Sequence, residues 1–377
     1  MSTNDIHDAP HGRRSTPNWY LPTIIASGQH PTTPASVRPS TGEVKLFLGC
    51  MLFGRWGRLG PLDVERLVDE AFDRGISGFE TAAAYGGGES EQLLGRALRG
   101  RTATICTKIM APGDRLEWSP AGVRKAIDAS RSRLRVDRID VLLVHRVDDS
   151  TPLPAMAEAL VSAVDAGSVK VVGTSCMSGD LLVEAQREAR AVNLSLEVEQ
   201  CQYSLLDRSA EASLLPVTQR YGMTPFLYGV LDEGILAEAT LLVGSSSGRR
   251  PEGNIKVHPW PTAAARACER RRSVARQLRE IAGQFDISLI DLALGFVRAS
   301  AAAFGSPPWV TVGARRHDQI AGICAALDTS WSCELQQAID ALVPPTSSVS
   351  IPARSQLRGS LVNALPYEIV PLQVGND

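Results

Sequence analysis

Residues 78–108 read GFETAAAYGGGESEQLLGRALRGRTATICTK and place three chemically distinct groups after two strand-like runs. The first apolar run is followed at once by Glu80 and, five residues further on, by Tyr85. The second run, 103–107, ends directly before Lys108. If both runs are strands of a parallel barrel, their C-terminal ends lie on the face where barrel enzymes build their sites. The spacing therefore predicts that an acid, a phenol and an amine come together.

A phenol beside an ammonium group can act as a general acid. Free tyrosine has a pKa of about 10, and a nearby cation lowers that pKa by favouring the phenolate. The phenol can then give its proton to a developing alkoxide, while a carboxylate holds the amine in place. We therefore hypothesise an acid–base site at Glu80, Tyr85 and Lys108. The alternative is that Tyr85 caps a loop and Lys108 is a solvated strand end.

Composition limits the classes of protein that the chain can be. With 377 residues and 44% hydrophobic content, it can form one α/β barrel, a fold that typically takes about 250 residues or more. The net charge of −2 and the lack of a basic stripe predict neither nucleic-acid nor membrane binding. No stretch approaches the roughly 20 apolar residues of a membrane span. Seven cysteines without a CxxC pair, and no export signal, predict reduced thiols and a cytoplasmic location.

Apolar runs and helical patterns alternate along the chain. Strand-like runs begin near residues 45, 77, 103, 139, 169, 194, 223 and 309, and helical patterns separate them. Eight such units favour an α/β fold of the (β/α)8 TIM-barrel type. The competing architecture is a doubly wound open sheet, which would carry GxGxxG after an early strand. Here the only glycine cluster, 86–88, follows the second strand and has the wrong order of glycines.

Changes in composition predict the boundaries of the folded part. Residues 1–43 are rich in Pro, Ser, Thr and His and are predicted to be mostly disordered. Residues 44–343 are predicted to form the barrel, and 344–377 a Pro- and Ser-rich tail. Residues 232–271 contain SSSGRRPEGN and HPWP and are predicted to be a long loop after strand seven, over the site face. A helix is expected over 272–284.

Polar residues also follow the later strands. His145 ends the fourth run and, together with Lys108 and Tyr85, is a candidate to polarise a carbonyl or relay a proton. A metal-dependent hydrolase is disfavoured because the histidines are scattered, without a His-x-His or carboxylate cluster at strand ends. No metal site is predicted.

Seven motifs in a fixed order give the chain a family resemblance. They are FETAAAYGGGESEQLLGRAL, CTK, IDVLLVH, VVGTS, EQCQYSLLDR, FLYGVLDEGIL and VGARRHDQI. Over roughly Val44 to Leu327 the chain resembles the aldo-keto reductase family. The resemblance implies a barrel that binds NADPH across the strand ends and reduces aldehydes and ketones without a metal. Residue patterns alone give only the phenol–amine–imidazole site, and the resemblance supplies the cofactor and the reaction.

The resemblance implies catalytic roles for four residues. Tyr85 would protonate the carbonyl oxygen, Lys108 would lower the pKa of Tyr85, and His145 would orient the carbonyl. Glu80 stands where the family normally has aspartate. Its extra methylene can still reach Lys108, but a displacement of about 1 Å can cost about a hundredfold in rate.

The resemblance also implies a set of cofactor contacts. They fall on Ser175, Gln200, Tyr228, Gly229, Val230, Leu231, Gly313, Arg315 and Gln319. Ser175 and Gln200 would hold the carboxamide, with Cys176 where the family usually has asparagine. Tyr228 would stack on the nicotinamide, residues 229–231 would meet the pyrophosphate, and the last three would meet the adenosine end. Arg315, with Arg316 as a second candidate, suits a 2′-phosphate, so NADPH is expected rather than NADH.

The expected function is NADPH-dependent reduction of an aldehyde or ketone, keto-sugars included, to the alcohol. The only partner predicted is a small-molecule carbonyl substrate. The alternative is a regulatory barrel that binds the cofactor with little or no turnover. Glu80 and Cys176 favour that alternative, whereas the intact Tyr85, Lys108 and His145 oppose it.

Overall fold

Eight parallel strands close into a barrel, and helices surround it. The computed structural model describes residues 44–109, 116–147, 150–237, 262–300, 304 and 307–345. The strands are β1 (Lys45–Gly49), β2 (Gly78–Glu80), β3 (Thr104–Ile109), β4 (Ile139–Val144), β5 (Val169–Ser175), β6 (Val198–Gln202), β7 (Thr224–Tyr228) and β8 (Trp309–Gly313). Each pairs with its sequence neighbours, and β8 pairs with β1 to close the barrel. The predicted TIM-type barrel is confirmed, and the open-sheet alternative is excluded.

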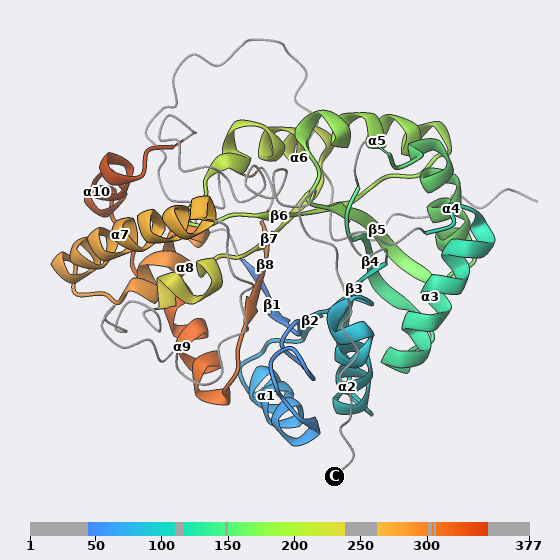
Figure 1. Ribbon diagram of the computed structural model, residues 1–377, viewed down its shortest axis with the longest axis horizontal. Helices are drawn as coiled ribbons and strands as arrows, with labels where there is room; N and C mark the ends of the chain where they lie inside the picture. The colour runs from blue at the N-terminus through green and yellow to red at the C-terminus, as the bar shows by residue number, and fades with distance from the viewer. Residues whose placement is uncertain are drawn as a thin grey trace, which may run out of the picture. The chain divides into compact units, whose positions relative to one another are not determined.

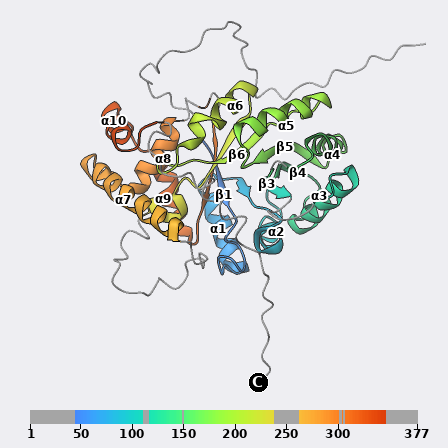
Figure 2. The same cartoon turned by 45° about the horizontal axis from the view of Figure 1, so that its top comes forward.

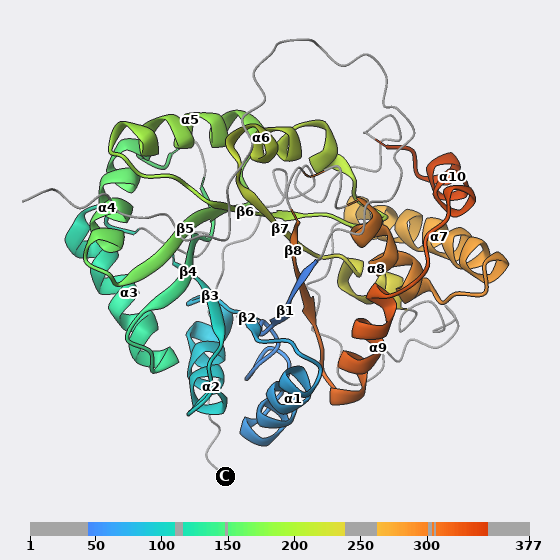
Figure 3. The ribbon, with the colours of Figure 1, turned by 180° about the vertical axis from the view of Figure 1, so that it is seen from behind.

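Helices cover the outside of the strands, as Figures 1 and 3 show from opposite sides. They are α1 (Pro61–Asp73), α2 (Glu89–Ala97), α3 (Pro120–Leu134), α4 (Leu153–Asp165), α5 (Gly179–Ala191), α6 (Leu214–Tyr221), α7 (Thr262–Gln284), α8 (Leu289–Ser300), α9 (His317–Leu327) and α10 (Cys333–Leu342). Short 3-10 turns are η1 (Tyr85–Gly87), η2 (Ser209–Ala212) and η3 (Asp232–Ala237). The last helix, α10, packs beside α7 (Figure 2).

Several helices begin at the residues where the sequence carries start signals. The Ser119 side chain accepts a hydrogen bond from the Gly122 backbone N–H at 3.1 Å, and Pro120 occupies the first turn of α3. The Ser178 side chain caps α5 in the same way. A capping hydroxyl pairs an N–H group that has no partner within the helix, and proline has no N–H to leave unpaired at that position. Local chemistry therefore fixes these two boundaries.

Two predicted boundaries are wrong. Helix α7 begins at Thr262 rather than 272, and η3 opens the segment that was predicted to be a loop throughout. Residues 262–271 read TAAARACERR, and their alanines and arginines are strong helix formers. The Gly-, Pro- and Ser-rich residues 238–261 lie outside the described residues, as do 1–43, 110–115 and 346–377.

The barrel interior sets which side chains reach its C-terminal mouth. A cluster inside the barrel consists of Phe47, Cys106, Val141, Leu143, Val198 and Phe226. Because side chains alternate along a strand, a residue two positions later faces the same side. Lys108, Gln200 and Tyr228 each lie two residues after a member of this cluster. The packed interior therefore directs these three side chains to the mouth of the barrel.

A buried ion pair connects the segment after β7 to α7. Arg271 donates to both carboxylate oxygens of Asp232, and the two side chains are 8% and 4% exposed. Asp232 itself has a left-handed backbone with φ of 48°, a conformation that is costly for residues other than glycine. The bidentate contact stabilises that backbone. It also ties the segment after Tyr228 to helix α7.

We expect Arg271→Met to lower the free energy of unfolding by about 3–5 kcal/mol, because it leaves the Asp232 carboxylate buried without a cation. The matched control is Arg276→Met on the same helix, whose side chain is 54% exposed and contacts Glu269 at 3.2 Å. An exposed pair of this kind contributes about 0–1 kcal/mol. Urea unfolding of the two variants measures the difference. Equal midpoints would contradict a stabilising role for the buried pair.

Candidate active site

Glu80, Tyr85 and Lys108 form one hydrogen-bonded cluster at the end of β2 and β3. The Lys108 ammonium donates to Glu80 Oε1, to Tyr85 Oη at 2.9 Å and to the Thr81 carbonyl at 3.1 Å. The Tyr85 hydroxyl lies 3.3 Å from Glu80 Oε1 and donates to it. Lys108 and Glu80 are 1% and 4% exposed. The structure thus brings together the acid, phenol and amine that the spacing predicted, and Glu80 reaches Lys108 despite its longer side chain.

Tyr85 is held by a glycine turn between β2 and α2. It opens η1, and the three glycines that follow have positive φ values of 60°, 69° and 91°. A side chain is disfavoured in that region, so glycine suits each position. On the other side, the Trp56 ring lies 5.8 Å from the Tyr85 ring, and Trp56 is 45% exposed. The turn therefore presents the phenol beside an exposed aromatic surface.

The His145 ring also contacts the phenol ring of Tyr85. The two rings meet edge-on, with centroids 5.7 Å apart. The His145 backbone N–H donates to the Ile109 carbonyl at 2.9 Å, which fixes it directly after β4. The imidazole therefore lies next to the phenol, as expected of a group that orients a carbonyl.

Burial changes the protonation of this cluster in a direction that the sequence did not predict. Burial and the Glu80 charge raise the pKa of Tyr85 well above its usual value, and the opposing effect of Lys108 is smaller. Burial acts to lower the pKa of Lys108, but the charges of Glu80 and Tyr85 raise it above its ordinary value. Lys108 lowers the pKa of Tyr85 as expected, but burial and the Glu80 charge outweigh it, so the net shift is upward. The cluster holds a neutral phenol next to a charged ammonium.

A second group of polar side chains lies at the ends of β5 and β6. Ser175 and Gln200 are paired in register, and the Ser175 hydroxyl lies 3.4 Å from Gln200 Oε1. Both are almost fully buried. Cys176 and Tyr228 meet above them, with Sγ and Oη 3.3 Å apart. A buried hydroxyl beside a buried amide offers donors and acceptors to a carboxamide, so these residues fit the nicotinamide end of the expected cofactor.

Gln200 also contacts the acid–base cluster. Its amide nitrogen donates to Glu80 Oε1 at 3.4 Å. The same carboxylate oxygen therefore accepts from Lys108, Tyr85 and Gln200. The expected proton donor and the expected carboxamide site are one connected network.

The residues expected at the other end of the cofactor lie around the start of α9 and the end of β7. Gln319 accepts from the backbone N–H groups of Arg315 and Arg316 at 2.8 and 3.1 Å. Arg315 donates to the Gly57 carbonyl at 2.9 Å, whereas Arg316 is ion-paired with Asp318. With five N–H donors on its guanidinium, Arg315 can bind a phosphate in addition to this contact. Gly313 is exposed beside it.

The backbone from Gly229 to Leu231 leaves β7 with a sharp turn. Gly229 has φ of 71°, and the Asp232 N–H donates to its carbonyl at 2.8 Å. Val230 is buried, so the turn is anchored in the core. A tight, anchored backbone turn at this position fits the expected contact with a pyrophosphate.

The sequence reasoning missed two side chains near the site. Trp56 precedes α1 in a segment without periodicity, so only its exposure and its contact with Tyr85 identify it. Glu199 lies next to Gln200 in β6 but faces the opposite way, and it is fully buried. The available signal was Glu199 itself, the second glutamate of the strand-like run LEVEQCQ at 196–202, because a buried acid requires a specific partner.

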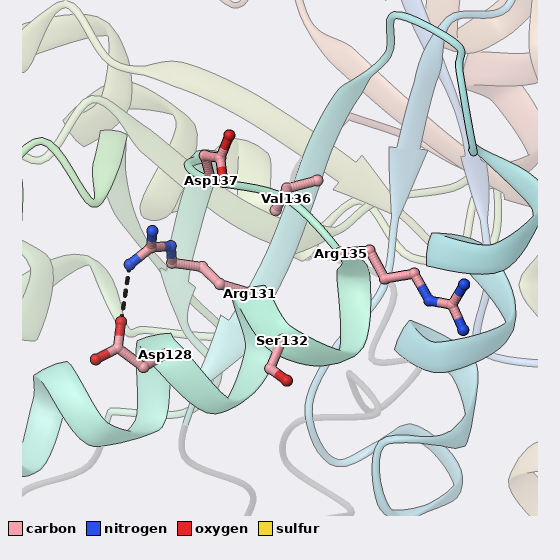
Figure 4. A pocket seen from close by; sticks show the side chains of 6 residues that line it. All are labelled: Asp128, Arg131, Ser132, Arg135, Val136 and Asp137. Carbon is pink, nitrogen blue, oxygen red and sulfur yellow. Dashed lines mark hydrogen bonds and ion pairs between the residues drawn. The ribbon is translucent and has the colours of Figure 1, made fainter.

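One surface hollow lies away from this site. It is lined by Asp128, Arg131, Ser132, Arg135, Val136 and Asp137, around the C-terminal end of α3 (Figure 4). The C-terminal end of α3 leads into the N-terminal end of β4, whereas Tyr85 follows the C-terminal end of β2. The hollow is therefore at the opposite end of the barrel from Tyr85. Arg131 in it is ion-paired with Asp128 at 2.8 Å, and the two side chains are 29% and 53% exposed. The hollow therefore does not belong to the candidate active site.

Among the described residues, no group of three or more His, Cys, Asp or Glu side chains is arranged to hold a metal ion. No helix in the same part of the chain is long and apolar enough to span a bilayer.

Comparison with known proteins gives a consistent result. The sequence model of the Aldo/keto reductase family matches residues 45–344. The uncharacterized oxidoreductase YrpG of Bacillus subtilis is 27% identical over 80% of this chain and 92% of its own. A probable voltage-gated potassium channel subunit beta of Oryza sativa is 26% identical over 76% of this chain and 90% of its own. The solved glycerol dehydrogenase AKR11B4 of Gluconobacter oxydans superposes with a TM-score of 0.65 and 25% identity, over 80% of this chain and 93% of that one.

The raised pKa of Tyr85 predicts that its phenol stays protonated at about pH 10, where half of free tyrosine is ionised. The measurement is the ultraviolet phenolate absorbance of the unaltered protein minus that of Tyr85→Phe, followed as the pH rises. We expect no difference signal at about pH 10 for the protein, and a half-developed signal for a free tyrosine amide as control. A half-developed signal from Tyr85 at that pH would show that Lys108 fully offsets burial and the Glu80 charge, and would contradict a raised pKa.

Proposed function

Since the chain belongs to the Aldo/keto reductase family and is an NAD(P)H-dependent oxidoreductase, we propose that it uses NADPH to reduce a small aldehyde or ketone to the alcohol. Tyr85 is the general acid in this proposal. The single observation that carries it is the hydrogen-bonded row of Tyr85, Lys108 and Glu80 at the barrel mouth. The scattered cysteines, free thiols in the described part of the chain, support a cytoplasmic location.

The proposed chemistry assigns one task to each side chain of the cluster. A bound reduced nicotinamide supplies the hydride. Tyr85 Oη holds the proton that the carbonyl oxygen needs. A phenol is protonated at neutral pH, and the raised pKa of Tyr85 keeps it so. Lys108 donates to Tyr85 Oη and so stabilises the phenolate that remains after proton transfer. Glu80 keeps Lys108 charged, and His145 orients the carbonyl from beside the phenol.

The substrate side of the site supports a small carbonyl compound. The exposed ring of Trp56 stands 5.8 Å from the Tyr85 ring and offers an apolar wall beside the proton donor. The solved relative is a glycerol dehydrogenase, and oxidation of an alcohol is the reverse of the proposed reaction. That relationship supports a small hydroxylated carbonyl substrate, keto-sugars included.

We infer NADPH rather than NADH from the adenosine end of the site. Arg315 lies at the N-terminal end of α9, where helix geometry already favours an anion. Its guanidinium can add a charge-assisted contact to a 2′-phosphate. Ser175 and Gln200 would hold the carboxamide, Tyr228 would stack on the nicotinamide, and the backbone of Gly229, Val230 and Leu231 would meet the pyrophosphate. Gly313 and Gln319 complete the adenosine end.

A regulatory barrel is the second candidate. The similarity to a probable potassium channel subunit beta and the Glu80 and Cys176 substitutions favour it. The intact Tyr85, Lys108 and His145 cluster favours turnover. Tight NADPH binding without reduction of any carbonyl tested would support the regulatory alternative.

The first test is Tyr85→Phe, assayed by NADPH consumption with a reactive aromatic aldehyde. Losing a general acid costs about 10²–10⁴-fold in turnover, so we expect a loss in that range. The dissociation constant for NADPH, measured by calorimetry, should stay unchanged. Tyr221→Phe on α6 is the matched control and should leave turnover intact. Turnover retained in Tyr85→Phe would overturn the assignment of the proton donor.

The second test is Arg315→Leu, with Arg316→Leu as the comparison. Hydrogen bonds to a charged group contribute about 1.5–3 kcal/mol, so we expect Arg315→Leu to weaken NADPH binding about 10- to 100-fold. Binding of NADH, which lacks the 2′-phosphate, should change little. Calorimetry with both nucleotides measures the ratio. An equal loss for NADPH and NADH would contradict the role of Arg315, and a selective loss in Arg316→Leu would assign the phosphate to Arg316.

A further inference from the structure

Glu199 is a buried acid for which the structure records no ion pair. Of the other buried acids, Glu80, Glu91 and Asp232 are each paired with a lysine or arginine, whereas Asp207 accepts hydrogen bonds from Ser209. Among the described residues, Glu199 has hydrogen bonds and no cation partner. Burial therefore raises its pKa to about 7, and its two hydrogen bonds oppose that rise. A buried carboxylate without a cation is costly. The two groups that donate hydrogen bonds to Glu199 therefore indicate its role in the fold.

Both hydrogen bonds of Glu199 fasten the chain around Ser175 and Cys176. The Thr174 hydroxyl donates to Oε2, and the Met177 backbone N–H donates to Oε1 at 3.1 Å. One carboxylate therefore bridges the residue before this pair and the residue after it. Ser175 and Cys176 belong to the turn that leads from β5 into α5.

The turn needs such a support. Cys176 has a left-handed backbone with φ of 61°, which costs roughly 1–2 kcal/mol for a residue with a side chain. Its own N–H donates to the Gln200 carbonyl at 2.9 Å. The next N–H, that of Met177, donates to Glu199 Oε1 at 3.1 Å. Without that acceptor the Met177 N–H would be buried and unpaired.

The position of Glu199 in β6 connects this support to the site. Glu199 and Gln200 are adjacent, so their side chains face opposite sides of the sheet. Gln200 faces the barrel mouth next to Ser175, whereas Glu199 faces the helices and holds the turn from behind. The strand register pairs Thr174 with Glu199 and Ser175 with Gln200. Strand β6 therefore supplies Gln200 to the site and Glu199 to the turn that follows β5.

We infer that Glu199 is a positioning residue that fixes the Ser175–Cys176 turn for the carboxamide of the nicotinamide cofactor. The inference rests on the proposed function for the identity of the ligand. Glu199 itself touches neither substrate nor cofactor in this assignment. It acts through the Met177 N–H and the Thr174 hydroxyl, which hold the turn in the conformation that binds.

The test compares three substitutions of the full-length protein. Glu199→Met removes both acceptors at similar volume, Glu199→Gln keeps an acceptor for Met177, and Thr174→Val removes only the other contact. We expect the NADPH dissociation constant and the KM for NADPH to rise about tenfold in Glu199→Met, the equivalent of one lost hydrogen bond. The kcat should stay close to that of the unaltered enzyme. Glu199→Gln should bind NADPH nearly as the unaltered enzyme does, whereas Thr174→Val should weaken NADPH binding by less than Glu199→Met does.

A second measurement needs no cofactor. Amide hydrogen exchange in the cofactor-free protein should show faster exchange at residues 175–178 in Glu199→Met and not in Glu199→Gln. If Glu199→Met does not fold, Glu199→Asp replaces it, because the shorter side chain withdraws the acceptor from Met177. The same rise in exchange and in the NADPH dissociation constant is expected of Glu199→Asp.

The outcomes separate this inference from the proposed function. If Glu199→Met and the unaltered enzyme bind NADPH with the same dissociation constant, the inference alone is overturned. Equal losses in Glu199→Gln and Glu199→Met would also overturn it, because the charge rather than the acceptor would then matter. Absence of NADPH binding by the unaltered enzyme would overturn the proposed function, and with it the role of the turn.

Discussion

The candidate site depends on burying a lysine and a glutamate together at the barrel mouth. Taking two such charges from water costs several kcal/mol per ion, and their attraction offsets this only when other hydrogen bonds complete the pair. Lys108 meets that condition, because its three N–H donors have three acceptors in Glu80, Tyr85 and the Thr81 carbonyl. The phenol is thus part of what makes the ion pair tolerable. Its position follows from the electrostatics of its neighbours as well as from its own turn.

Support for the site comes from the outer face of the same strands. Thr107 precedes Lys108 and donates to Glu91 at 2.6 Å, and Glu91 is paired with Arg133 on α3. Thr174 precedes Ser175 and donates to Glu199 in the same manner. In both cases a threonine on the helix-facing side bonds a buried acid, and the next residue faces the barrel mouth. Hydrogen bonds on the outer, helix-facing side of β3 and β5 therefore fix the ends of these strands. The neighbouring side chains, which face the barrel mouth, form the site.

Some of these features could be predicted from the sequence and some could not. The first residues of β1, β4, β5 and β8 match the predicted positions 45, 139, 169 and 309, because a short apolar run is defined by a few neighbouring residues. The beginning of α7 was not predicted, because the Gly-, Pro- and Ser-rich residues 238–261 led us to extend the loop over the helix-forming residues 262–271. The positions of Glu80 and Lys108 followed from strand ends alone.

Contacts between distant segments were beyond sequence reasoning. Gln200 and Glu80 are 120 residues apart and meet only because β2 and β6 face each other across a closed barrel. The bidentate contact of Arg271 with Asp232 likewise depends on α7 returning to the end of β7. The direction of the Tyr85 pKa shift depends on burial, which a strand-end pattern does not reveal. Each of these features is set by what the fold packs around a group, and the sequence shows only the group.

The extra methylene of Glu80 has a structural consequence of its own. Its Oε1 reaches Lys108, Tyr85 and Gln200 at once, so the acid–base cluster and the expected carboxamide site share one oxygen atom. An aspartate has a shorter reach from the same strand, so it is less able to bridge to Gln200 while remaining paired with Lys108. Any group that hydrogen-bonds the Gln200 amide competes with Glu80 for the same donor. Engaging Gln200 would therefore free part of the Glu80 charge to act on Lys108 and Tyr85, which couples occupation of the carboxamide site to the proton donor.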